Sequence, residues 1–230
     1  AIQRVPVTNT RYIAFLDALV DAGRAEEAQR YVPRERSVRS GRAGAMLYGR
    51  RDDGSFCLIP NAEGNMWQPE WPVLMVTWHA AAAYARWCAE RDGLPWRLPG
   101  ELEWEKAARG VDGRTYPWGD FLDLTWCCVL ASHAGRQVPA SVDAHPGDIS
   151  PYGVLGMGGN ARDWCAEPFS VEGPTAPVPE PQQPGDPDTM RVARGGARYS
   201  ASREARAGTR IRAPQGLNRG GIGIRLVRSL

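Results

Sequence analysis

The chain has 230 residues, of which 43% are hydrophobic and 23% charged, and its 28 basic and 26 acidic side chains leave a net charge of +2. These proportions exclude a disordered or fibrous chain, and the near balance of charge argues against a nucleic-acid partner. Because no apolar run approaches the roughly 20 residues that cross a bilayer, we also expect no membrane span.

The cysteines and the start of the chain bear on its compartment. There are five cysteines, including the adjacent Cys127 and Cys128, and no Cys-x-x-Cys motif. This odd number and spacing argue against a disulfide framework or a zinc site. The first residues lack the basic-then-apolar pattern of a signal peptide, so the sequence predicts a cytoplasmic protein with reduced cysteines.

In the first half, helical and strand patterns alternate. Apolar residues at helical spacing predict a helix that starts at Thr8 or Asn9 and ends near Gly23. Short apolar runs at 45–48 and 56–59 flank the turn signal Asp52-Asp53-Gly54, which indicates a hairpin.

The next segment, 72–78, is continuously apolar and predicts a buried strand. Thr77 is placed to cap a helix over 79–91, and a further amphipathic helix is expected over 101–109.

Beyond Gly110 turn residues dominate, and a proline-rich stretch at about 168–188 predicts an exposed loop. Two apolar stretches, 191–196 and 221–227, close the chain. Short strands, few helices and long loops together predict an irregular α+β protein. Since no repeat and no second core follow the proline-rich stretch, we expect one domain over 1–230.

Several stretches resemble one known family. They include WPVLMVTWHAAAAYARWCAERDGLPWRLPGELEWEKAARG (71–110), SPYGVLGMGGNARDW (150–164), RVARGGARYS (191–200) and GIGIRLVRS (221–229). These resemble, in the family's order, the formylglycine-generating enzyme (sulfatase-modifying factor) family. The resemblance implies a C-type lectin-like α+β fold, with two helices around short antiparallel sheets and long irregular loops. DDGSFCLIP and VDGRTYPWGD look similar to the bacterial branch in which the domain follows a protein kinase or lies in a phage-borne gene.

The resemblance also implies where the family's metal would bind. In the enzymes two cysteines after an RGGSW-type motif bind copper, and Ser200 and Ala205 stand at the matching positions here. No cysteine follows Cys165, and neither a hydroxyl nor a methyl group replaces a thiolate. We therefore expect that the chain is not an enzyme.

An iron site like that of the family's ergothioneine-synthesis branch is also poorly supported. That branch needs a histidine-rich helical domain, whereas the three histidines here, His79, His133 and His145, are far apart in the sequence. We expect no cofactor of this kind.

Calcium is the one cofactor left open. By resemblance, the family's GNxxEW motif would place the carbonyls of Gly159 and Ala161 and the carboxylate of Asp163 around the ion. Gly156 replaces an asparagine that is common in the family, and Cys128 falls at the other family site, where it is a poor ligand. The alternative is that Asp163 pairs with an arginine or with backbone amides.

The segment 197–221 is the candidate ligand-binding region. It resembles the variable region of diversity-generating retroelement proteins, in which adenine-specific mutagenesis varies asparagine codons on an exposed face of this fold. The residues expected at such codons, with one neighbouring arginine, are Arg198, Tyr199, Ser200, Ala201, Thr209, Ile211, Leu217, Gly220 and Gly221.

Three functions stay open from the sequence. The first is a non-catalytic display domain that binds a protein or another surface ligand through this segment. The second is an enzyme, or the remnant of one, of the formylglycine-generating family. The third is a sensing domain fused to, or associated with, a protein kinase. The sequence does not identify the ligand.

Overall fold

The computed structural model describes residues 1–36, 43–61, 63–135, 137–174, 186, 189–216, 218 and 220–229. Four α-helices lie within these residues: α1 (Asn9–Asp21), α2 (Ala25–Tyr31), α3 (Trp78–Asp92) and α4 (Glu101–Arg109). Two short 3₁₀ turns, η1 (Leu130–Ser132) and η2 (Ser202–Ala205), lie in the loops. The strands are β1 (Arg34–Arg36), β2 (Ala43–Met46), β3 (Tyr48–Arg50), β4 (Phe56–Leu58), β5 (Trp96–Arg97), β6 (Arg162–Pro168), β7 (Met190–Arg194), β8 (Arg210–Pro214), β9 (Ile222–Gly223) and β10 (Val227–Arg228).

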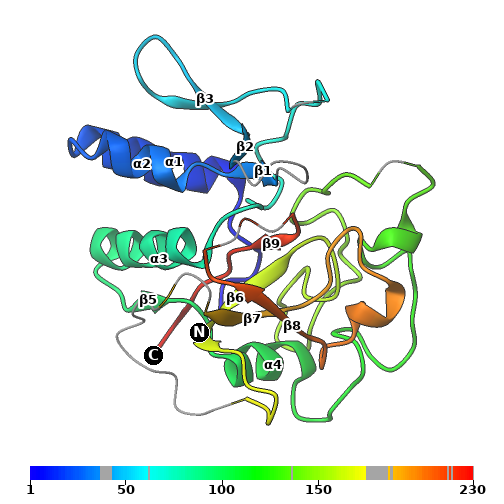
Figure 1. The fold of residues 1–230 in the computed structure, drawn as a ribbon. Coiled ribbons are helices and arrows are strands. Elements are labelled where there is room, and N and C mark those ends of the chain that lie inside the picture. The colour runs from blue at the N-terminus through cyan, green and yellow to red at the C-terminus, as the bar shows by residue number, and fades with distance from the viewer. Residues whose placement is uncertain are drawn as a thin grey trace.

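A four-stranded sheet positions the C-terminal segment. Its order is β8-β7-β6-β9, with β6 antiparallel to β7 and parallel to β9. Helix α4 lies against β6 and β7, while α1 and α3 contact each other on the other side of the molecule (Figure 1). Three two-stranded sheets, β1-β2, β3-β4 and β5-β10, complete the strands that the structure describes.

The predicted helices are confirmed, with one addition. The hydroxyl groups of Thr8 and Thr77 accept hydrogen bonds from Arg11 N and Ala80 N, as helix caps do. Helix α4 has the predicted bounds, and the Glu103 carboxylate accepts from Gly100 N at 2.7 Å at its start. Helix α2 was not predicted, because its seven residues are mostly polar and too few to show a helical period.

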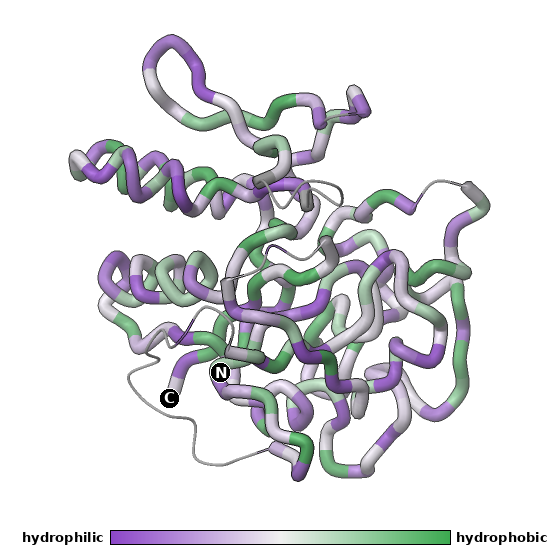
Figure 2. Tube along the Cα trace, in the orientation of Figure 1, coloured by the Kyte–Doolittle hydropathy of each residue, from purple (hydrophilic) through white to green (hydrophobic). Residues whose placement is uncertain are grey.

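The predicted hairpin is β3-β4, in which Tyr48 pairs with Leu58 and Arg50 with Phe56. Its turn carries hydrophilic residues at the tip, as Figure 2 shows. The run 45–48 is nevertheless divided, because Ala43–Met46 pairs with β1 instead of β4. The proline-rich stretch lies largely outside the described residues.

The prediction of a strand over 72–78 is wrong, although Val73, Leu74 and Val76 are buried as expected. Met75 has a φ of +62°, which breaks the alternation of an extended strand. Val73 N donates to Val7 O at 2.8 Å. The segment thus fills the core as an irregular connection, which its apolar composition alone cannot distinguish from a strand.

All nine tryptophans lie between Trp67 and Trp164 in the sequence, and this part of the chain supplies the largest side chains of the core. Trp78, Trp104 and Trp164 are fully buried, and each indole N–H donates a hydrogen bond, to Cys165 O, Asp163 and Val76 O respectively. All five cysteines are free and four are buried. No helix among the residues described here has the length and apolar character needed to cross a membrane.

An ion pair lies at the centre of this core. Asp163 on β6 and Arg225 after β9 are both 0% exposed, and Arg225 Nε donates to Asp163 Oδ2 at 2.8 Å. The remaining guanidinium donors reach the carbonyls of Leu155 at 2.9 Å and of Gln3 and Arg4 at 3.2 Å. One arginine therefore ties together the N-terminus, the 155–156 loop and the central sheet.

Removing Arg225 should be strongly destabilising, because it leaves the Asp163 carboxylate buried without its cation. We expect Arg225→Met to lower the free energy of unfolding by about 3–5 kcal/mol, measured by urea denaturation. Arg24→Met is the matched control: it breaks the solvent-exposed pair with Glu27 and should cost far less, because water screens an exposed ion pair. Equal losses of unfolding free energy in the two variants would show that the buried pair contributes no more to stability than the exposed one.

Candidate ligand-binding site

Burial divides the C-terminal segment 197–221 into two classes of residue. Of the predicted binding residues, Ser200 and Gly221 are buried. Leu217 lies outside the described residues. The partly exposed members are Arg198, Tyr199, Ala201, Thr209, Ile211 and Gly220.

The expectation that Ser200 faces the solvent is wrong, since it is 1% exposed. Its hydroxyl accepts from Arg162 Nη2 at 2.6 Å and from Ala197 N at 2.9 Å, and its carbonyl accepts from Leu130 N at 3.0 Å. Ser200 therefore fixes the turn after β7. Ala205, the other position that matches a copper cysteine in the resemblance, is also fully buried.

Gly221 is also part of the framework. A Cβ atom at this position would lie 2.5 Å from the Tyr199 hydroxyl and 2.8 Å from the Ala197 Cβ. At the neighbouring Gly220 a Cβ atom would be 3.9 Å or more from any other side chain, which is ordinary contact. The two adjacent glycines thus differ sharply in their tolerance of a side chain.

Tyr199 is held between two arginines. The Arg198 and Arg162 guanidinium groups lie 5.5 and 5.8 Å from the centre of its ring. Arg198 also donates to Gly220 O at 2.9 Å and to Gln137 O at 3.2 Å. The aromatic ring is therefore a positioned, partly exposed feature of the segment.

Ile211 on β8 packs against the main hydrophobic cluster. It is only partly buried, so one portion of its side chain belongs to the core and the other reaches the surface.

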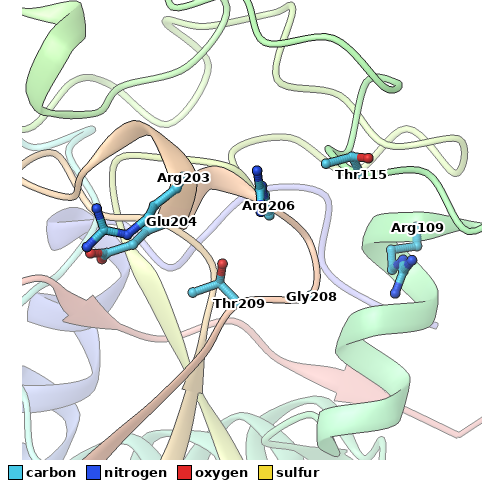
Figure 3. Close-up of a pocket in the computed structure, with 7 residues that line it drawn as sticks. All are labelled: Arg109, Thr115, Arg203, Glu204, Arg206, Gly208 and Thr209. Atoms are coloured by element: carbon cyan, nitrogen blue, oxygen red, sulfur yellow. The ribbon is translucent and has the colours of Figure 1, made fainter.

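Beside these residues lies a cavity of about 480 Å³ (Figure 3). Its lining comes from η2 and the loop before β8, from the end of α4, and from the loop that follows α4. The lining residues are Arg109, Thr115, Arg203, Glu204, Arg206, Gly208 and Thr209. Five of the seven lie in the predicted segment 197–221, although Thr209 alone was named there as a binding residue. Arg109 and Thr115 were not predicted, because the cavity forms where the end of α4 meets a segment about 100 residues later and no local pattern records that contact.

The cavity is electropositive. Glu204 is paired with Arg162, and Arg109 with Glu105 at 2.8 Å. Within the part of the chain that the structure describes, the side chains of Arg203 and Arg206 make no ion pair or hydrogen bond, and both are exposed. Two uncompensated positive charges therefore border the cavity.

Its Arg109 wall is fixed by buried ion pairs. Glu105, which holds Arg109, also accepts from Arg194, and Arg194 donates to Glu101 at 2.9 Å. Arg210 on β8 forms a second pair with Glu101. Because Arg194 and Glu101 are 0% and 1% exposed, helix α4 cannot shift against the sheet without breaking these contacts.

The residues implied for calcium do not fit that ion. The Asp163 carboxylate is enclosed and neutralised by Arg225, and the Gly159 carbonyl accepts from Ala161 N at 2.8 Å. One buried oxygen, Asp163 Oδ1, has no hydrogen-bond partner among the residues that the structure describes, but a single oxygen beside an arginine is not a calcium site. The alternative pairing of Asp163 with an arginine is the observed one.

Among the described residues, no group of three His, Cys, Asp or Glu side chains could hold a metal ion. His133 lies 3.5 Å from the Cys128 thiol, and burial raises the pKa of that thiol to about 11. A protonated thiol is a poor metal ligand and nucleophile.

A second buried carboxylate stands near the Gly158-Gly159 turn. Asp148 accepts from Gly158 N at 2.9 Å with both oxygens and is 1% exposed. Burial raises the pKa of this carboxyl to about 7, despite the opposing effects of these amides and of Arg225. It is thus a group whose protonation differs between the folded and unfolded chain near neutral pH.

The stability of the protein should therefore depend on pH through Asp148. Between the ordinary pKa of 3.8 and about 7, the unfolded chain releases this proton while the folded chain keeps it, so stability falls as pH rises. Relative to Asp148→Asn, the wild type should lose on the order of 4 kcal/mol across this window, measured by urea denaturation. A difference between the two proteins that stays constant with pH would contradict the assignment.

The glycine pair separates framework from surface within the segment. Gly221→Ala should lower the free energy of unfolding by about 1–3 kcal/mol, because the new methyl group forces Tyr199 and Ala197 apart. Gly220→Ala, the matched control one residue away, should change it by less than about 1 kcal/mol. Thermal or urea denaturation measures both changes. Equal losses of stability in the two variants would refute the division of the segment into framework and surface positions.

Comparison with known sequences identifies a family that the chain matches. The chain matches the sulfatase-modifying factor enzyme 1-like domain over residues 1–230. It is 32% identical over 229 residues to the formylglycine-generating enzyme of Streptomyces coelicolor, covering 85% of this chain and 66% of that protein. It is 27% identical over 228 residues to the serine/threonine-protein kinase pkn1 of Chlamydia pneumoniae, covering 98% of this chain but 32% of the kinase.

Solved structures show the same fold. PvdO from Pseudomonas aeruginosa superposes with a TM-score of 0.72 at 21% identity, over all of this chain and 80% of that one. Variable protein 1 of Treponema denticola superposes with a TM-score of 0.51 at 18% identity, over 70% of this chain and 72% of that one. These likenesses confirm the predicted α+β fold class. The match over residues 1–230 shows that the chain belongs to the sulfatase-modifying factor enzyme 1-like family.

Proposed function

We propose that this chain is a non-catalytic ligand-binding domain whose binding surface is the exposed part of segment 197–221. One observation carries the proposal: the positions matched to the copper cysteines, Ser200 and Ala205, are sealed in the core, while their neighbours form an electropositive, partly exposed surface. Within one segment, the framework is thus separate from the residues that can contact a partner.

This separation suits a display surface. A rigid sheet can carry different side chains at exposed positions without losing the contacts that hold the fold. Ala201, directly before η2, and Thr209, directly before β8, are partly exposed positions in the loops that this sheet supports, whereas Ser200 bonds Arg162 and the backbone. The fold shared with the Treponema denticola variable protein supports diversification of this kind, in which the identity of the ligand differs between sister proteins.

A kinase-associated sensing role is the second candidate. The observation that favours it is the likeness to pkn1 of Chlamydia pneumoniae, which covers nearly all of this chain and about a third of the kinase. In that role the same surface would bind a signal while a neighbouring kinase domain responds. The cytoplasmic location, the single domain and the absence of a nucleic-acid partner stay predictions.

The non-catalytic assignment predicts that the protein retains no copper and consumes no oxygen with a cysteine-containing peptide, because it lacks the thiolate pair that Cu(I) requires. Metal analysis after incubation with Cu(I), together with an oxygen electrode, measures both quantities. The Streptomyces coelicolor formylglycine-generating enzyme serves as the positive control.

Peptide-dependent oxygen uptake above the no-protein rate would favour the enzyme and end the display proposal. Sequencing of the terminal coding segment from sister clones tests diversification separately. Changes confined to adenine-derived codons at exposed positions would support it, and changes spread evenly over framework positions would contradict it.

A further inference from the structure

The strongest feature that the fold does not account for is the pair of uncompensated arginines at the cavity. Arg203 and Arg206 lie on η2 and directly after it, and their side chains have no carboxylate or carbonyl partner among the described residues. Elsewhere in the core, Arg162, Arg194 and Arg225 are all paired. Two cations bordering one cavity without a protein partner indicate an anionic ligand.

The other lining groups complement these cations. Arg109 enters from α4 on the opposite side of the cavity, and Thr209 directs its hydroxyl toward the space below Arg206 (Figure 3). No hydrogen bond uses the Thr115 or Thr209 hydroxyl within the described chain. The wall thus offers forked N–H donors and hydroxyl donors around one space, a set suited to several oxygens of a single anion.

Building on the proposed function, we propose that this cavity binds a phosphate monoester. The two unpaired guanidinium groups match its charge of about −1.5 to −2 at neutral pH, and its three terminal oxygens can accept from both arginines and a threonine. A carboxylate or a phosphate diester carries one negative charge and would leave one arginine uncompensated. The cavity of about 480 Å³ also has room for the group that carries the phosphate.

The test titrates the wild-type protein by calorimetry with inorganic phosphate, glucose 6-phosphate and a peptide containing phosphoserine. The unphosphorylated peptide and dimethyl phosphate are the controls. We expect saturable binding of inorganic phosphate and of both monoesters, but not of the two controls. Binding of the monoesters should weaken as the pH falls below about 6, where the phosphate group takes up a proton. Tighter binding of the peptide or of the sugar phosphate identifies the source, and either result supports the assignment.

Variants locate the binding. Arg203→Gln/Arg206→Gln should weaken monoester binding by about tenfold or more, because it removes two charge-assisted hydrogen bonds. Arg24→Gln/Arg86→Gln removes the same charge from the second cavity, of about 350 Å³, which also contains Glu27 and Glu90, and should leave the affinity within about twofold. Thr209→Val should lower the affinity without changing its dependence on pH.

No saturable binding of any monoester, or equal affinity in the two double variants, would overturn the inference. Neither result bears on the proposed function, which the copper, oxygen and clonal-sequence measurements test without reference to this cavity. Circular dichroism of each variant distinguishes a lost site from a lost fold.

Discussion

The fold depends on the ion pair between Asp163 and Arg225, which lies in the core without contact with water. Burying two charges is costly unless each is fully partnered, and here Arg225 also satisfies backbone carbonyls from the N-terminus and from the 155–156 loop. The same loops are also joined by backbone hydrogen bonds, such as Leu155 N to Arg4 O at 2.8 Å. The Arg225 guanidinium group adds to these bonds and connects them to the central sheet through Asp163.

A second buried network continues this arrangement toward the surface. Arg194 and Arg210 bind Glu101, and Glu105 connects Arg194 to Arg109 at the cavity. These pairs join α4 to β7 and β8. A surface side chain at the end of α4 thereby acquires a fixed position relative to the C-terminal segment, which is what a ligand site requires. The abundance of arginine suits this construction, since a guanidinium group can bind several oxygens at once.

The same segment illustrates how one stretch of chain serves two purposes. Ser200 and Gly221 are fixed by contacts in the interior, whereas Thr209 and the neighbouring arginines line an open cavity. Residue type does not separate the two groups, because serine, glycine and alanine occur in both. Burial separates the two groups. Substitution at the buried positions alters stability, and substitution at the exposed positions alters binding.

The sequence by itself determined the helices α1, α3 and α4 to within about two residues at each end. It also determined the hairpin turn, the family and the absence of cysteines beyond Cys165. These follow from local periodicity, capping residues and motifs, which act between near neighbours in the chain. Only the tertiary structure decided that Asp163 pairs with Arg225 and that Ser200 is buried. It also decided that 72–78 is not a strand and that Arg109 and Arg206 line one cavity. Each of these depends on contacts between distant segments, and a one-dimensional pattern carries no record of which distant partner a side chain will meet.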